Sequence, residues 1–297
     1  MIKRLLPMAL AGLTLPALAT PVAAITDADP AVWVAADKDT TIYLFGTIHA
    51  LDGKQPWFDD EVRAAFDRSD ELVLEIIPPD VSSLQPIIGK YIFDTSGRTL
   101  TSKLSPQGRE RLADALARAG LPATALDRYK PFFASITLTT LTFQKMGYSS
   151  DTGAEKILQK AATSAGKKVG ALETIDYQLS LFDRLSEAEQ LKLLESSLQE
   201  ADSMPAEIAG LVAAWAKGDA KRVAALLNQT DLESPALYHL LLVDRNKSWA
   251  EWIDRRLDQP GTVFLAVGAG HLSGKDSVQK LLKKRGIRSR RMRPGRH

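Results

Sequence analysis

The chain has 297 residues, no cysteine, and 38 Lys and Arg against 36 Asp and Glu. The absence of cysteine excludes a disulfide framework, a lipid-anchored lipoprotein and thiol catalysis. The length is enough for one large α/β domain or two small ones.

The first 24 residues have the features of a secretory signal peptide. Lys3 and Arg4 supply positive charge, residues 5–19 are mostly apolar, and residues 22–24 (VAA) form a small-x-small cleavage site. Cleavage after Ala19 is a second possibility. Removing Lys3 and Arg4 leaves equal numbers of basic and acidic residues, so the formal net charge becomes zero. We therefore expect a periplasmic or secreted protein with no integral membrane span and no nucleic-acid partner, in which residues 25–297 form a single α/β domain.

In chain order, residues 31–34 and 41–45 predict a β-hairpin with a polar turn. Pro56 is expected to open a helix, and residues 71–77 form the next strand, with Glu75 at its carboxyl end. A strand–helix–strand succession favours parallel pairing with a right-handed crossover. Residues from 80 to about 150 lack strand alternation, so we predict a helical insertion that covers the sheet edge.

The second half continues this alternation. Glu155 lies at the start of a helix over 154–165, and the strand 167–173 ends in Glu173. Helices are expected from 177 to 227, and Pro235 opens a long helix, to about 257, that carries Arg245. A strand from 262, a basic helix from 275 and a short strand over 287–292 follow. The predicted fold class is α/β, with a central mixed sheet flanked by helices.

Two similar segments near opposite ends of the chain each combine an apolar run with a Gly-x-x-His motif: TIYLFGTIH (41–49) and TVFLAVGAGH (262–271). An apolar run bounded by Gly is typical of a strand buried on both faces. The histidine then lies at the carboxyl end of the strand, the edge at which open α/β sheets bind ligands. One such histidine is more often an ordinary loop residue, but two in matching contexts predict that His49 and His271 share a site.

Positive charge is concentrated after Asp276, where basic residues occur without any acid. Such a segment could contact an anionic lipid or polymer. We expect instead a solvated helix end followed by an edge strand protected by Lys and Arg.

The polar residues at the predicted strand ends suit hydrolytic chemistry. Six candidate site residues are expected near the predicted sheet edge: His49, Glu75, Glu155, Glu173, Arg245 and His271. Two imidazoles and a carboxylate suit Zn, Mn, Co or Fe(II), and an open coordination position could activate water. One Glu would be a ligand and another a general base, while an arginine could hold a substrate carboxylate or stabilise an oxyanion. Alternatively, each Glu caps a helix or pairs with a surface Lys.

The chain resembles the TraB/GumN (TraB/PrgY/Tiki) family over nearly its whole mature length. The resemblance rests on the order and spacing of short motifs: LFGTIH (44–49), ELVLE (71–75), KPF (130–132), GAE (153–155), LET (172–174) with Gln178, Arg245-Asn246 with Trp249, and VGAGHLSG (267–274). It implies a fold similar to those of erythromycin esterase and ChaN-like proteins. By this resemblance, His49 and His271 are the central pair, with Glu75, Glu155 and Arg245 as co-actors.

Two functions follow as expectations. The first is a metal-dependent, peptidase-like hydrolase acting in the periplasm on a peptide or small molecule, with Mn, Co or Zn held by His49, His271 and Glu75. In it, Glu75, Glu155 and Arg245 take catalytic roles, and Glu155 and Glu173 compete for the place of third carboxylate. The second is a non-catalytic binding protein that sequesters a peptide, haem or polysaccharide in the same cleft.

Overall fold

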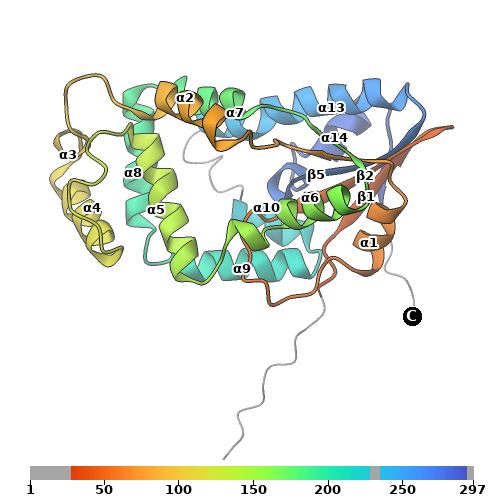
Figure 1. The fold of residues 1–297 in the computed structure, drawn as a ribbon, viewed down its shortest axis with the longest axis horizontal. Coiled ribbons are helices and arrows are strands. Elements are labelled where there is room, and N and C mark those ends of the chain that lie inside the picture. Colours follow the sequence, from red (N-terminus) through yellow and green to blue (C-terminus); the bar gives the residue numbers. More distant parts are fainter. Residues whose placement is uncertain (1–27, 228–234, 293–297) are drawn as a thin grey trace, which may run out of the picture.

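A six-stranded mixed sheet organises one end of the molecule in the computed structural model, which describes residues 28–227 and 235–292 (Figure 1). The strands are β1 (Val32–Ala36), β2 (Thr40–Thr47), β3 (Glu71–Leu74), β4 (Lys168–Ala171), β5 (Gly261–Gly268) and β6 (Ser289–Arg291). Their order is β4-β3-β5-β2-β1-β6. Strands β4, β3, β5 and β2 run parallel, whereas β1 is antiparallel to both β2 and β6. The predicted mixed α/β sheet is confirmed.

Helices flank the sheet and form the opposite end of the molecule. They are α1 (Asp60–Asp67), α2 (Val81–Ile92), α3 (Leu100–Lys103), α4 (Pro106–Arg118), α5 (Pro131–Lys145), α6 (Ala154–Ser164), α7 (Ile175–Asp183), α8 (Glu187–Gln199), α9 (Met204–Ala216), α10 (Ala220–Leu227), α12 (Pro235–Tyr238), α13 (Asp244–Leu257) and α14 (Val278–Lys284). Short 3-10 turns η1 (Ser150–Thr152) and η3 (Ala269–Leu272) and a π-helical turn η2 (His239–Val243) complete the described elements.

Strands β2 and β5 pair along their full length, from Thr40 opposite Gly261 to Thr47 opposite Gly268. Apart from the first residues of each strand, their side chains are buried on both faces. This burial explains the continuous apolar runs in the sequence, since a parallel strand between two helix layers has no solvent face. The register places the two Gly-x-x-His motifs side by side.

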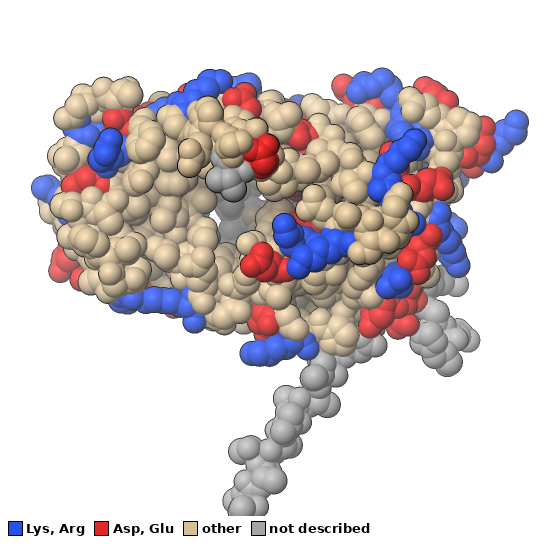
Figure 2. All heavy atoms as spheres, in the orientation of Figure 1, with Lys and Arg blue, Asp and Glu red and all other residues tan. Residues whose placement is uncertain are grey.

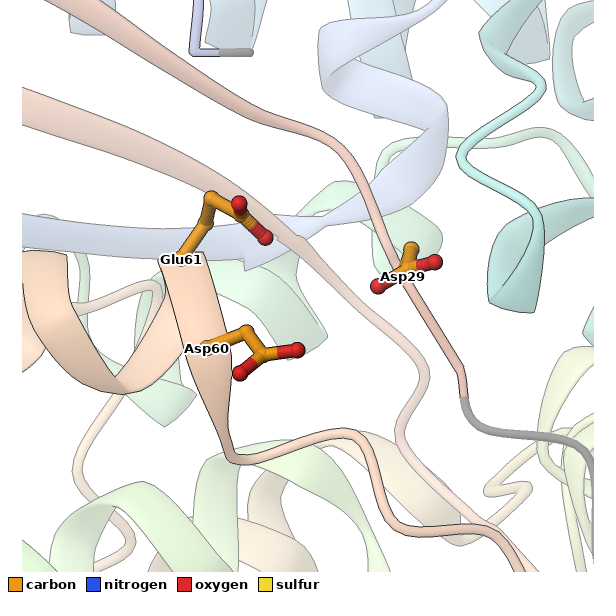
Figure 3. Close-up of side chains that lie close together, drawn as sticks. All are labelled: Asp29, Asp60 and Glu61. Carbon is orange, nitrogen blue, oxygen red and sulfur yellow. The ribbon is translucent and has the colours of Figure 1, made fainter. Parts of the chain in front are cut away.

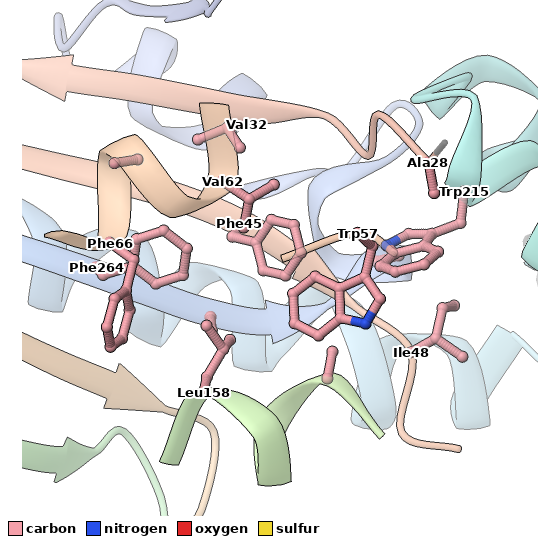
Figure 4. Packing of buried hydrophobic residues seen from close by; sticks show 14 of the residues in the cluster. Ala28, Val32, Phe45, Ile48, Trp57, Val62, Phe66, Leu158, Trp215 and Phe264 are labelled. Carbon is pink, nitrogen blue, oxygen red and sulfur yellow. The ribbon is translucent and has the colours of Figure 1, made fainter. Parts of the chain in front are cut away.

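Two apolar cores lie on opposite faces of the sheet. One contains aromatic side chains from strands and helices, among them Phe45, Trp57, Phe66, Trp215 and Phe264 (Figure 4). Phe45 stacks on Trp57 with ring centroids 5.5 Å apart, and the Trp215 indole donates to the Gly46 carbonyl at 2.6 Å. The other core packs α13 and α14 against β2 and β5. The central strands are thereby fixed from both sides.

A third apolar cluster joins helices at the end remote from the sheet. It contains residues of α3, α4, α5 and α8, including Leu100, Leu116, Leu138 and Leu194. Helices α2 to α5 occupy the stretch for which we predicted a helical insertion. Ser105 caps α4 through the Gly108 amide, and Ser186 with Glu189 forms a capping box on α8.

Several predicted boundaries differ from the structure. The helix expected from Pro56 begins at Asp60, because Trp57 is inserted into the core and holds the preceding chain out of helical geometry. The strand expected to reach residue 77 ends at Leu74, where Glu75 turns toward neighbouring strands. The long helix from Pro235 is interrupted by the π-helical turn η2. Residues 1–24, predicted as a signal peptide, and His297 lie outside the described residues.

None of the helices in the described part of the chain has the length and apolar character needed to cross a bilayer.

Candidate functional site

Four neighbouring strands end in polar residues at one edge of the sheet. Glu75 immediately follows β3, His49 lies two residues after β2, Glu173 two residues after β4, and His271 three residues after β5. Because these strands are parallel and adjacent, their carboxyl ends meet at the same edge. Figure 2 shows a hollow between the helical end of the molecule and the half that contains the sheet. The strand ends thus bring together residues more than 200 positions apart.

Gly268 lies at the centre of this group. A Cβ atom on Gly268 would lie 3.2 Å from Glu75 Oε1, 3.6 Å from His49 Nε2 and 3.7 Å from His271 Cδ2. The Gly268 amide itself donates to Glu75 Oε1 at 2.6 Å. A side chain at this position would therefore crowd Glu75 Oε1 and come into contact with both histidines, which gives the glycine of the second motif a steric reason.

His49 is paired with Glu155 through Nδ1. The distance from Nδ1 to Glu155 Oε1 is 2.5 Å, and Thr47 Oγ1 donates to the same oxygen at 2.5 Å. Glu155 reaches this place from the first turn of α6, where a carboxylate is also favoured by the helix dipole. The His49 Nε2 atom makes no hydrogen bond to any described residue, and 70% of the side chain is exposed.

Glycine also controls the approach of α6 to β2. The Ala154 amide donates to the Ile48 carbonyl at 3.1 Å, and a Cβ on Gly153 would lie only 2.0 Å from the His49 carbonyl oxygen. No side chain larger than hydrogen can occupy this position without moving the helix. Gly153 therefore allows Glu155 to reach His49.

The pair controls the protonation of His49. The protein atoms crowded around the ring lower its pKa even though solvent reaches most of its surface, but the charge and hydrogen bond of Glu155 outweigh this effect and raise the pKa to about 9. At neutral pH the imidazole is mainly protonated, and its Nε2–H has no acceptor among the described residues. Because solvent screens such an exposed pair, its main consequence is for proton transfer rather than for stability.

Arg245 joins three strand ends into one network. Its Nη2 donates to Glu75 Oε2 at 2.7 Å and to Glu173 Oε2 at 2.8 Å, and its Nε donates to Glu173 Oε1 at 3.0 Å. Its Nη1 donates to the Leu241 carbonyl and to His271 Nε2, both at 3.1 Å. A guanidinium has five N–H groups, and all five are directed at protein acceptors. The arginine is buried and follows η2, a type of turn that is frequent at functional sites.

His271 is held on both sides. Its Nδ1 lies 2.6 Å from Asn246 Oδ1, while the Asn246 amide donates to the Asp276 carbonyl at 2.8 Å. This orientation makes Asn246 Oδ1 an acceptor, so the proton of the neutral imidazole lies on Nδ1 and Nε2 accepts from Arg245. The Trp249 ring packs on His271 with centroids 4.3 Å apart and donates through Nε1 to Glu173 at 2.8 Å.

Burial and charge set opposite ionisation states in this network. Burial lowers the pKa of His271 to about 3, and the nearby Arg245 acts in the same direction. Burial raises the pKa of Glu75, but His271, Arg245 and the Gly268 amide lower it to about 2. At neutral pH the site therefore contains an anionic Glu75 beside a neutral His271.

The donor types predicted for a divalent ion are present, but their arrangement does not fit one. Both histidines have Nδ1 anchored by an oxygen, the usual pattern behind a metal-bound Nε2. However, His271 Nε2 already accepts from Arg245, and both Glu75 oxygens accept hydrogen bonds. His49, His271 and Glu75 also do not place three ligand atoms within 4.8 Å of one another. An ion could bind all three only if Arg245 released His271.

One group of three in the described residues meets that spacing: Asp29, Asp60 and Glu61, before β1 and at the start of α1 (Figure 3). Asp29 and Asp60 are exposed. Exposed carboxylates commonly lie close together without an ion, because water screens their repulsion. We assign this acidic group no function.

All six residues singled out from the sequence are in the same region: His49, Glu75, Glu155, Glu173, Arg245 and His271. Both Glu155 and Glu173 belong to this group, since Glu155 pairs with His49 and Glu173 with Arg245. Thr47 was missed, although its place inside the first motif could have indicated a partner for Glu155. Gln178 links Glu75 and Glu173 at 3.3 and 3.0 Å.

A family model described as the TraB/PrgY/gumN family matches residues 31–291. The chain belongs to the TraB/PrgY/gumN family. Among family-like relatives, an uncharacterized protein of Treponema pallidum (strain Nichols) is 22% identical, over 85% of this chain and 80% of that protein. The uncharacterized protein YbaP of Escherichia coli (strain K12) is also 22% identical, over 86% of this chain and 92% of YbaP. No solved structure matches the chain. The geometry of the site is therefore the guide to the function of this TraB/PrgY/gumN protein.

Proposed function

We propose that this protein is a hydrolase that cleaves a peptide or other amide bond of its substrate and uses His49 to transfer the proton. The observation that carries the proposal is the His49–Glu155 pair, in which Nδ1 is held at 2.5 Å and Nε2 is left open beside Gly268 and Glu75. A carboxylate-held imidazole with a free second nitrogen is the usual arrangement of a general base that later acts as a general acid.

The proton transfers balance with water as the co-substrate. Neutral His49, the minority form below its pKa of about 9, takes a proton from water at Nε2 while the water oxygen attacks the carbonyl carbon, and Glu155 stabilises the resulting imidazolium. The same proton then passes to the leaving nitrogen as the carbon–nitrogen bond breaks, giving a carboxylic acid and an amine. An amine is a poor leaving group until it is protonated, and the imidazolium formed in the first step supplies that proton.

Arg245 serves this proposal as a positioning residue. Its guanidinium contacts Glu75, Glu173 and His271 and has no N–H left for a substrate unless one of these bonds is exchanged. It keeps Glu75 in the anionic form and holds His271 in one orientation, and both residues lie close to His49, the reacting histidine.

Metal-dependent hydrolysis is the second candidate. It is favoured by the anchored Nδ1 atoms of both His49 and His271, which direct the ring geometry that Mn, Co or Zn ligands require. A bound ion would supply activated water. Metal analysis after incubation with each ion separates the candidates: about one ion per wild-type chain, lost in the H49A/H271A double variant, supports the second.

The activity test uses the protein without its first 24 residues and a peptide library, with and without added ions. We expect cleavage by the wild type, a loss of about 10²–10⁴-fold in H49A, and retention in H239A, whose histidine lies outside the site on η2. Folding of each variant is checked by circular dichroism. A folded H49A variant with full activity would overturn the proposal. Saturable peptide binding without cleavage would instead support a binding protein.

A further inference from the structure

A wide basic groove lies beside the turn that follows His271. Its volume is about 1070 Å³, and its wall includes Trp33 of β1, parts of α10, α14 and β6, and Leu272 and Gly274 of the turn. The groove exceeds the range of about 300–1,000 Å³ that is common for small-molecule pockets. It can therefore take several units of an oligomer.

The described side chains that line the groove include several positive charges and no negative charge. Five exposed cations line it: Lys221, Lys280, Lys283, Arg288 and Arg291. No carboxylate is among the lining residues that the structure describes, and none of the five forms an ion pair with a described residue. From the sequence we expected this region to be a solvated helix end and a protected edge strand. Strand β6 does lie at the edge of the sheet, and the structure in addition gathers cations from three separate elements, including Lys221 of α10, around one concave surface.

Two further features of the groove would favour the binding of a ring-shaped ligand that carries hydroxyl groups. Trp33 is half-buried and offers a flat apolar face with a polar edge. Gln279 donates through Nε2 to the Leu272 carbonyl at 3.0 Å, which leaves its buried Oε1 without a hydrogen-bond partner in the described structure. A buried acceptor in this state is stabilised by a donor such as a hydroxyl group.

We propose that this groove binds an acidic oligosaccharide. The carboxylates or other acidic groups of the sugar pair with the five cations, a sugar ring packs on Trp33, and a hydroxyl donates to Gln279. This proposal does not depend on the proposed hydrolysis.

Other polyanions fit the groove less well. Strand β6 has only three residues and carries Arg290 and Arg291, a feature of edges protected against the addition of a peptide strand. Proteins that bind single-stranded nucleic acid stack successive bases on several aromatic rings, whereas Trp33 is the one aromatic lining residue. A bilayer surface calls for exposed apolar side chains, and none of the large exposed apolar residues lines the groove.

The test measures binding of a fluorescently labelled oligogalacturonate of about ten units to the full chain, by anisotropy at several salt concentrations. We expect binding that weakens with salt and falls at least tenfold in K280E/K283E. The matched variant K156E/K160E makes the same charge change at two exposed lysines of α6 outside the groove, and it should bind within twofold of the wild type. Q279A and W33F should each weaken binding severalfold.

An uncharged ester of the same sugar and three other classes of anionic probe decide the partner class. Methyl-esterified oligogalacturonate, poly-glutamate, oligodeoxythymidylate and vesicles containing phosphatidylglycerol should all bind more weakly than the acidic sugar. Tighter binding of any of them would overturn the proposal. So would equal losses in the two double-lysine variants, or no binding of the acidic oligosaccharide by a wild-type protein shown to be folded.

Discussion

His49 and His271 follow adjacent parallel strands in matching motifs, yet their pKa values move in opposite directions. His49 faces the Glu155 carboxylate and remains open to solvent, whereas His271 is buried beside the Arg245 guanidinium. The neighbours that a histidine meets therefore decide whether it carries charge at neutral pH. In the proposed hydrolysis, this difference gives proton transfer to His49 and leaves His271 neutral and fixed.

The first prediction concerns the carboxylate that holds His49. Replacing Glu155 by Gln removes its charge, so the His49 pKa should fall from about 9 by at least one unit, since the charge and hydrogen bond of Glu155 are what raise it. Imidazole NMR shifts followed from pH 5 to 10 measure this change. Glu110→Gln, on an exposed face of α4, is the control and should leave the titration unchanged. An unaltered pKa in E155Q would contradict the pairing.

The second prediction concerns stability and pH at His271. The folded protein keeps this ring neutral down to about pH 3, while the unfolded chain binds a proton near pH 6.5. The free energy of unfolding should therefore fall as pH decreases from 6.5, by up to about 1.4 kcal/mol per pH unit. Glu75, with a pKa lowered to about 2, adds a loss of the same sign only below pH 4.5.

Urea unfolding at pH 4.5, 5.5 and 6.5 checks this second prediction. His271→Gln removes the titrating ring and should flatten the slope in this interval. Equal slopes in the wild type and in H271Q would show that another group causes the dependence.

Among the elements, α6 depends on a single glycine to reach the end of β2. The sequence predicted helix 154–165 correctly to within a residue, because its apolar positions and its Glu-containing first turn are local signals. The contact between Gly153 and the His49 carbonyl is not local. Helix propensity therefore explains why these residues form a helix, and tertiary packing explains where the helix lies.

The third prediction follows from this contact. Gly153→Ala should lower the free energy of unfolding by about 1–3 kcal/mol through overpacking and should shift the His49 titration, because α6 must move. Gly210→Ala, within helix α9, is the matched control: outside its own helix, the nearest atom to the new Cβ would be Leu226 Cδ1 at 4.0 Å. There alanine should stabilise by about 0.5–1 kcal/mol. Chemical denaturation of both variants measures the difference, and equal effects would contradict the steric argument.

In the molecule as a whole, the buried apolar side chains of the described residues form three separate clusters. Two lie on the faces of the sheet, and the third joins α3, α4, α5 and α8. Because few of its apolar contacts are shared with the sheet, the third cluster is expected to open independently of it. The carboxyl edge with His49 and Glu75 belongs to the more firmly fixed half.

The fourth prediction tests this division by hydrogen exchange. Leu194→Ala, in the third cluster, should cost about 2–5 kcal/mol and accelerate amide exchange in α4, α5 and α8, but not in β2 and β5. Leu265→Ala, in the central strand β5, should accelerate exchange throughout the described chain. Both leucines are almost fully buried. Faster exchange of β2 in L194A would show that the two halves open together.

Local patterns in the sequence specify the strands, most helices and the edge at which the histidines lie. Apolar runs ended by glycine, together with capping residues, are local features that survive in almost any tertiary setting. They sufficed to predict a mixed α/β sheet with His49, Glu75, Glu155, Glu173 and His271 at the ends of its elements, whereas the order and spacing of short motifs, one of which contains Arg245, indicated the family. They did not determine the helix start at Asp60 or the π-helical turn before Arg245, which depend on packing.

The partners of these residues depend on the tertiary structure. Glu155 pairs with His49 because α6 approaches the end of β2, and Glu173 pairs with Arg245 because the arginine side chain of α13 reaches the residues that follow β3 and β4. The Arg245 donors are all directed at protein acceptors, and Lys221 joins the cations of α14 and β6 around one groove. Hydrogen bonds and charge interactions act over a few ångströms, so residues far apart in sequence acquire their chemistry only when the fold brings them together.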